Sequence, residues 1–577
     1  MTSEPPLAPF RMPQRLFAEL AAGGGSAEAV AFLERAERAR RLLLLRTLLD
    51  RLDTLPTPLT PAAEAWCALK EAAERAPEPV DRLLLASATG GWIAHVLRRL
   101  HGTGAGPPLW AEAGHLNALA VTASLHAGTE TDLRIPLTDG ALLLPGLGLA
   151  RLQEPEPGLT VGRARTREGR LTLTGPGASG SPVSSVIRPA TVSLPGGRVG
   201  AGSAVQPDAS WQALRTLTLR TPTASVAIPL DDLDPYRDLD DPLPPARLDE
   251  AEAEAWQGLF EEAAGLLMTA DCGEPGYCGP GRFDPAAIRA IVPWGRTSAL
   301  RPAPPTVLLS ASSGDSFGGM VIARPSSALA LAETLVHEFQ HSKLAALLHL
   351  FPLLDDDRAE RYYAPWRADP RHLTGLLHGA YAFTGVAGFW RHRLAEAPDS
   401  RAADEAGYHF ALRRLQSRLV ARTLLTSGRL TPQGHALVTG LVRTLDGWLR
   451  EPVPRAALGR ARTAAALHRT EWRLRNVVPA PAPNPATPRL RPDRVSWPDV
   501  RTHAFATRPS APRTADEHLA ADHPAAAFAR YADALAADPA EPHTLAGWIV
   551  ARAALEPGRA ARRMLARPEL FPPLPSG

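Results

Sequence analysis

The chain has 577 residues, with 63 Lys and Arg against 60 Asp and Glu and a formal net charge of +3. This length predicts about three to five domains, and the balanced charge gives no electrostatic reason to expect a nucleic acid or an anionic membrane as partner. No stretch approaches the ~20 apolar residues that span a bilayer, and no signal peptide is evident, so we expect a soluble, cytoplasmic protein.

Residues 1–128 are predicted to form an N-terminal helical region, because apolar residues recur there at spacings of three and four. Ser26 and Thr60 directly precede helical patterns and are the predicted N-terminal caps. Residues 129–240 form a β-rich region of short runs bounded by Gly, Pro and Asp. The first two regions therefore differ in secondary structure.

Residues 241–398 contain a helical pattern, "AEAEAWQGLFEEAAGLLM", and then "TVLLSASSGDSFGGMVIARP", which predicts two strands around a Gly/Ser turn. The second strand, "GGMVIARP", precedes an apolar helix and is a predicted edge for pairing with an extended peptide. Residues 399–577 are predicted to be helical, with a Pro-rich loop at 477–500. Cys272 and Cys278 flank "GEPGY" without a further Cys/His pair, which favours a loop over a zinc knuckle.

The apolar helix carries an HExxH motif, His337-Glu338-Phe339-Gln340-His341. Two residues four apart lie about 40° apart around a helix, so both histidines project from one face and form half of a metal site. Glu338 lies beside that face, where it can orient a ligand or act as acid or base. The alternative is a helix whose histidines only make hydrogen bonds in the core or at the surface.

A third ligand is not supplied by the extended HExxHxxGxxH pattern, because Leu344 and Leu347 occupy its glycine and third-histidine positions. His378 lies in the helical, apolar "LTGLLHGAYAFTGVAGFW" and is our predicted third ligand. A lone histidine on an apolar helix is otherwise a satisfied core residue. His349, eight residues after His341, is the weaker candidate.

The stretch "YYAPWRADPR" is dense in groups that bind carboxylates: Tyr362, Tyr363, Arg367 and Arg371. These residues are the candidates for binding a small di-acid or a peptide carboxylate. The alternative is a loop that packs its aromatic residues and pairs Arg367 with Asp369 or with the acidic run Asp355–Asp357.

Together, "LAETLVHEFQHSKLAALL" and "RYYAPWRADPRHLTGLLHGAYAFTGVAGFWR" resemble the HExxH-type peptide-modification family of actinobacterial RiPP pathways. The family is described as 2-oxoglutarate-dependent β-hydroxylases of ribosomally synthesised precursor peptides, and the resemblance covers roughly residues 10–450. It implies Fe(II), 2-oxoglutarate and O₂, with His337 and His341 as iron ligands. The expected fold is α+β, multidomain and mainly helical, with a zincin-like HExxH catalytic core.

Two other functions stay open. A zinc metallopeptidase would bind Zn²⁺ through the same histidines and use Glu338 to deprotonate the attacking water. A non-catalytic peptide-binding protein would hold a structural metal in a closed four-ligand site. A precursor peptide is the expected partner of the oxygenase, and the oligomeric state is not predicted.

Overall fold

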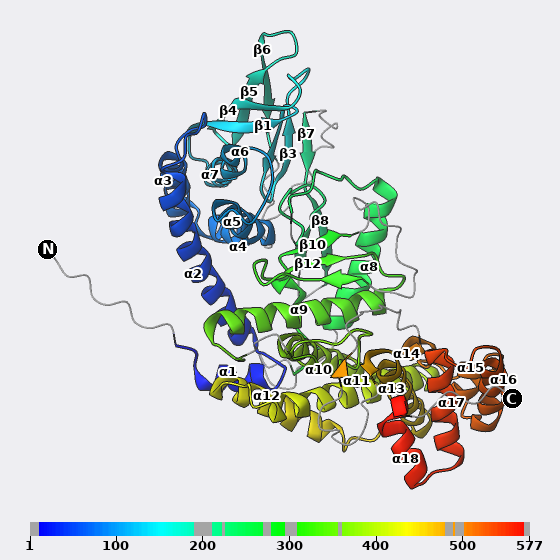
Figure 1. The fold of residues 1–577 in the computed structure, drawn as a ribbon. Helices are drawn as coiled ribbons and strands as arrows, with labels where there is room; N and C mark the ends of the chain where they lie inside the picture. Colours follow the sequence, from blue (N-terminus) through cyan, green and yellow to red (C-terminus); the bar gives the residue numbers. More distant parts are fainter. Residues whose placement is uncertain are drawn as a thin grey trace.

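The computed structural model describes residues 11–189, 210–221, 225–239, 241–268, 279–294, 309–355, 360–478, 489–490 and 501–570. The fold is mixed α and β, mainly helical and multidomain, which confirms the predicted class at that level. Figure 1 shows the N-terminal helices beside one sheet, a second sheet in the middle of the molecule, and a helical C-terminal part.

The N-terminal region is helical, as predicted. Ser26 caps the long second helix, since its Oγ accepts from Ala29 N over 3.2 Å. The prediction for Thr60 was wrong: its Oγ1 accepts from the backbone N–H of Arg134 over 2.7 Å and joins the third helix to a strand. The helices are α1 Gln14–Ala21, α2 Ala27–Leu52, α3 Ala62–Arg75, α4 Pro77–Leu85, α5 Ser87–Leu100, α6 Leu109–Ala113 and α7 His115–Ala127.

A seven-stranded antiparallel sheet follows, in the order β6-β5-β4-β1-β2-β3-β7. Alternate residues of β5 are buried, which is typical of a sheet with one face on a core. The buried face shares one hydrophobic core with α2–α5 and α7. The strands are β1 Thr131–Thr138, β2 Ala141–Leu144, β3 Gly148–Arg151, β4 Leu159–Arg167, β5 Arg170–Pro176, β6 Pro182–Ile187 and β7 Trp211–Ala213.

A five-stranded mixed sheet has the order β11-β12-β10-β9-β8, with β9, β10 and β12 parallel and the two outer strands antiparallel. It joins strands from the predicted ranges 129–240 and 241–398. The predicted peptide-pairing strand "GGMVIARP" contains β12, which has a neighbour on both sides, so that prediction was wrong. Within the described ranges β11 is the edge of this sheet. The strands are β8 Arg215–Arg220, β9 Ser225–Leu230, β10 Ala290–Pro293, β11 Ser310–Ala311 and β12 Gly319–Ile322.

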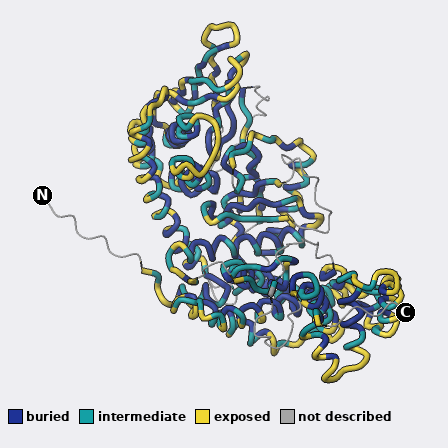
Figure 2. The backbone as a smooth tube through the Cα atoms, in the orientation of Figure 1, coloured by how far each residue is buried: buried dark blue, intermediate teal, exposed yellow. Residues whose placement is uncertain are grey.

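Two helices, α8 and α9, pack beside this sheet, and α10 lies on the other side of α9 (Figure 1). Together with α1, α11 and α12 they share the largest hydrophobic core. Figure 2 shows α9 and α10 as mostly buried tubes. These elements are α8 Glu250–Met268, the short 3₁₀ turn η1 Pro285–Ala287, α9 Ala328–Leu350, α10 Leu373–Ala395, α11 Ser400–Thr426 and α12 Pro432–Trp448.

The C-terminal helices build a third core against α11 and α13. A partly buried ion cluster connects them: Arg501 pairs with Asp516 and Glu471, and His543 lies 3.2 Å from each of these carboxylates. The elements are α13 Arg455–Asn476, β13 Val477–Val478, β14 Arg489–Leu490, α14 Arg501–Ala504, α15 Ala515–Ala520, α16 Pro524–Ala537, α17 Pro542–Leu555, α18 Arg559–Ala566 and η2 Pro568–Leu570.

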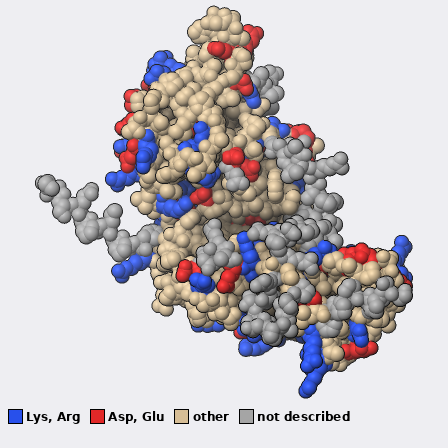
Figure 3. Space-filling view, viewed as in Figure 1, with Lys and Arg blue, Asp and Glu red and all other residues tan. Residues whose placement is uncertain are grey.

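Two sequence predictions lie outside the described residues: the Cys272–Cys278 loop and most of the Pro-rich loop 477–500, of which only β13 and β14 are described. Within the described ranges, no helix is both long and apolar enough to cross a membrane. Figure 3 shows Lys and Arg interspersed with Asp and Glu on the visible face, in keeping with the balanced net charge.

Candidate metal centre and its pocket

The HExxH helix α9 is fixed by an N-terminal cap and by hydrogen bonds on its buried side. Ser327 Oγ caps its start by accepting from Ala330 N over 3.2 Å. On its buried side, Gln340 Nε2 donates to the carbonyl of Gly23 and Lys343 Nζ to that of Gly24, both over 2.8 Å. Gly23 has φ of 87°, a conformation that favours glycine. The Gly-rich turn between α1 and α2 therefore fixes the helix that carries the motif.

A cavity of about 490 Å³ lies along the face of α9 that carries His337 and His341. Its wall is made by residues 310–314, by the face of α9 from His337 to His349, by Arg367 and by His378. This volume is in the range of small-molecule and peptide-binding pockets. The structure therefore brings the predicted motif residues, one predicted arginine and the predicted third histidine into one pocket.

The two motif histidines face each other with His337 Nε2 and His341 Nε2 3.0 Å apart. Two nitrogens that each lie about 2.1 Å from one ion are ~3.0 Å apart at a right angle and ~3.4 Å apart at a tetrahedral angle. Burial lowers the pKa of His337 to about 4, with a smaller effect of Arg413. Burial also lowers the pKa of His341 to about 3. Both rings are therefore neutral at pH 7, as metal ligands must be.

His378 approaches the pair from a different side. Its Nδ1 lies 3.3 Å from Nδ1 of His341, on the edge of that ring that points away from His337. Burial lowers the pKa of His378. In the part of the chain that the structure describes, no three His, Cys, Asp or Glu side chains converge on one ion position. His378 therefore approaches the Nδ1 of His341, and not the two Nε2 atoms of the motif pair that face each other.

Glu338 is buried and has two different oxygens. Oε1 accepts a hydrogen bond from Ser310 Oγ on the edge strand β11 over 2.6 Å. Oε2 is buried and has no hydrogen-bond partner among the described residues. Glu338 and Ser310 both line the cavity, and the carboxylate has one oxygen fixed by Ser310 and one buried oxygen without a described partner. Sequence reasoning missed Ser310; its only signal was the Ser-rich turn before the motif helix.

The four predicted carboxylate-binding residues are not all at the cavity. Arg367 lines it, and its Nε also donates to Asp369 Oδ1 over 3.0 Å. Arg371 pairs with the same carboxylate over 2.9 Å and is not part of the cavity wall. Of these two arginines, Arg367 is thus the one that lines the cavity. Its pairing with Asp369 is the contact that the alternative interpretation of this loop predicted.

The two tyrosines are used elsewhere. Tyr362 exchanges two backbone hydrogen bonds with Arg371, of 2.8 and 3.0 Å, and its hydroxyl bonds to Glu360. Tyr363 directs its hydroxyl to His468 Nδ1 on α13, 2.8 Å away. Both tyrosines shape the loop that carries Arg367, and neither lines the cavity.

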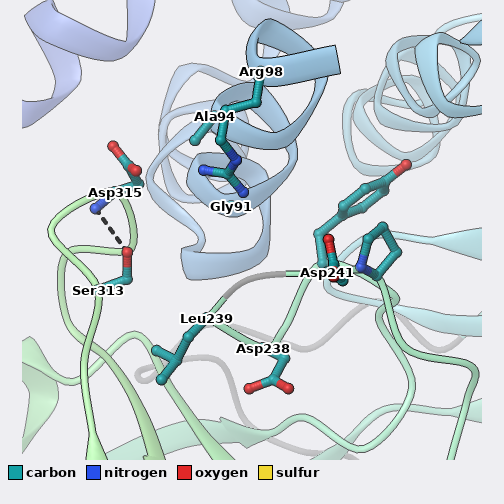
Figure 4. Close-up of a pocket in the computed structure, with 10 residues that line it drawn as sticks. Gly91, Ala94, Arg98, Asp238, Leu239, Asp241, Ser313 and Asp315 are labelled. Atoms are coloured by element: carbon teal, nitrogen blue, oxygen red, sulfur yellow. Dashed lines mark hydrogen bonds between the residues drawn. The ribbon is translucent and has the colours of Figure 1, made fainter. Parts of the chain in front are cut away.

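A second hollow lies beside α5, the connector after β9 and the 313–315 turn (Figure 4). Its volume is about 10 Å³, enough for about one water molecule. Ser313 lines both hollows. The smaller one is therefore a packing gap next to the candidate site. The residues labelled in Figure 4 are Gly91, Ala94, Arg98, Asp238, Leu239, Asp241, Ser313 and Asp315.

Comparison with known proteins adds no identification. None of the protein-family models matches the chain, and neither does any curated protein sequence.

Proposed function

We propose that this chain is an Fe(II)- and 2-oxoglutarate-dependent hydroxylase that acts on the β-carbon of a side chain in a ribosomally synthesised precursor peptide. The observation that supports it most is the neutral His337–His341 pair, 3.0 Å apart, at the wall of a 490 Å³ cavity that Arg367 also reaches. The resemblance of the motif segments to a family of peptide hydroxylases gives the reaction class.

The donor set fits iron in part. Two neutral imidazole nitrogens 3.0 Å apart are close enough to bind one ion together, and imidazole is a ligand that suits iron. His337 and His341 would hold Fe(II), and His378 would be the third ligand. When bound, iron together with 2-oxoglutarate and O₂ supplies the oxidising chemistry, which protein side chains do not provide.

The chain's own residues then bind, orient and shield. Arg367 offers a guanidinium to the distal carboxylate of 2-oxoglutarate, an interaction that arginine makes in a bidentate manner. The Oε2 of Glu338, which has no described partner, accepts a hydrogen bond from the bound substrate or a bound water, while Ser310 keeps the carboxylate in place. Ala345 and Leu348 give this wall an apolar part that excludes water.

The edge strand β11 offers a place for the peptide. Among the described residues it pairs with β12 alone, and Ser310 and Ala311 line the cavity. An extended peptide that adds to this edge would run past the HExxH histidines, with its backbone held by main-chain hydrogen bonds. In this proposal the peptide binds at the strand before "GGMVI", rather than at that strand.

A zinc metallopeptidase is the second candidate, because the free, buried Oε2 of Glu338 beside the two histidines is also what a general base needs. Glu338→Gln separates the two. It should abolish hydrolysis by a peptidase, whereas a hydroxylase keeps measurable conversion of 2-oxoglutarate to succinate. The assay measures succinate from the Fe(II)-loaded protein, with His337→Ala as the inactive control; zinc-dependent peptide cleavage and no succinate would refute the hydroxylase.

A further inference from the structure

At the end of the cavity away from the HExxH pair, two polar atoms have no hydrogen-bond partner among the described residues. His349, in the last turn of α9, lines the cavity, and no described residue hydrogen-bonds to its Nε2. Ser312 lines the same cavity, and its buried Oγ also has no hydrogen-bond partner among the described residues. A β-carbon placed on Gly314 would lie 3.8 Å from His349 Nε2, so this nitrogen faces the 312–314 turn across a narrow space.

His349 is oriented by a carboxylate behind it. Its Nδ1 lies 2.6 Å from Oε1 of Glu37, which is on α2 and only 1% exposed. A carboxylate on Nδ1 fixes the tautomer and turns Nε2 outward. The two residues lie 312 positions apart in the sequence, so only the fold brings them together. A buried carboxylate that supports a pocket histidine is typical of a histidine that contacts a ligand.

The charges around this pair favour an anionic partner. Glu37 lies 3.7 Å from Arg40, and Arg40 also pairs with Asp315 over 2.8 Å. The buried Arg41 interacts electrostatically with Glu37 and with Asp315. The two acidic and two arginine side chains cancel, so His349 adds one uncompensated positive charge when it is protonated. A carboxylate that enters the cavity is the group that balances this charge.

The distance from the metal centre suits a peptide. His349 follows His341 by eight residues on one helix, a rise of ~12 Å. An extended peptide advances about 3.3 Å per residue, so this end of the cavity meets a residue about three to four places from the one at the HExxH pair.

We propose that His349, supported by Glu37 and assisted by Ser312, binds an Asp or Glu side chain of the peptide, three to four residues from the hydroxylated one. In its protonated form, the imidazole donates to Glu37 from Nδ1 and to the peptide carboxylate from Nε2. This inference rests on the proposed function, because it takes the occupant of the cavity to be a peptide. His349 is a specificity-determining residue in this account.

The test uses immobilised pools of ten-residue peptides, each with one residue fixed at one position and random residues elsewhere. The full-length protein, loaded with Fe(II) and 2-oxoglutarate without O₂, is titrated over pools that fix Asp or Glu and over pools that fix Asn or Gln. We expect acidic pools to bind about 10- to 100-fold more tightly at one position or more, the effect of one charged hydrogen bond. His349→Leu and His349→Gln should reduce this ratio to about one. His435→Leu, an exposed histidine on α12, should retain it.

His349→Gln can still donate to Glu37, so it covers the case in which His349→Leu does not fold. A wild-type protein that does not distinguish acidic from amide pools, or His349 variants that keep the preference, would overturn the inference. The visible band of iron-bound 2-oxoglutarate, recorded on the same samples, separates this failure from a failure of the proposed function. The band should form in the wild type and in both His349 variants.

Discussion

Replacing Ser310 by alanine removes the hydrogen bond that Ser310 Oγ donates to Glu338 Oε1 over 2.6 Å. A hydroxyl bound to an ionised carboxylate contributes about 1.5–3 kcal/mol. Glu338 is only 1% exposed and its other oxygen has no hydrogen-bond partner among the described residues, so the substitution leaves a buried carboxylate without a side-chain donor from that part of the chain. We therefore expect the free energy of unfolding to fall by about 2 kcal/mol or more.

Ser312→Ala is the matched control two residues along. Its Oγ is buried without a described partner, so its removal should leave the stability unchanged within about 0.5 kcal/mol or raise it. Urea denaturation of the wild type, Ser310→Ala, Glu338→Ala and the double variant gives the coupling between the two side chains. Single-variant effects that add within about 0.5 kcal/mol would refute the reasoning, because residues that share a hydrogen bond are not additive.

Three further outcomes are expected. Gly379→Ala should destabilise the protein by about 1–3 kcal/mol in thermal unfolding, because its β-carbon would lie 2.0 Å from the indole of Trp366. Burial lowers the pKa of His543, but hydrogen bonds to two carboxylates outweigh it and raise this pKa to about 9. The stabilisation that protonated His543 contributes is therefore complete below pH 6.5 and is lost as pH rises through 9. After allowance for solvent screening, the free energy of unfolding should fall by about 1 kcal/mol over this pH range, and this fall should be absent in His543→Gln. Arg367→Met should raise the half-saturating 2-oxoglutarate concentration about tenfold or more, while Arg371→Met, outside the cavity wall, should not.

Local patterns in the sequence predicted the elements that carry the site. The apolar spacing before and after the HExxH motif indicated the helix that the structure has at Ala328–Leu350, and the Gly/Ser turn before it indicated β11 and β12. Ser26 was a correct cap because its partner is three residues away. Thr60 was not, because its hydroxyl accepts from an N–H 74 residues further on.

Contacts between distant segments account for what the sequence did not predict. Ser310 meets Glu338 only because β11 is the edge of a mixed sheet beside α9. The pairing of His349 with Glu37 needs α2 and α9 to pack together across 312 positions. For His378, the residue type and the helix were predicted, but which ring nitrogen faces His341 depends on side-chain torsions that no sequence pattern fixes.

The most direct test of the proposed function is optical. The metal-free protein is loaded with Fe(II) without O₂, 2-oxoglutarate is added, and the visible spectrum is recorded for the wild type, His337→Ala and His378→Ala. We predict the charge-transfer band of an iron-bound 2-oxo acid in the wild type and its loss in both variants. No band in the wild type, with zinc retained and peptide cleavage that requires Glu338, would contradict the hydroxylase and leave the peptidase.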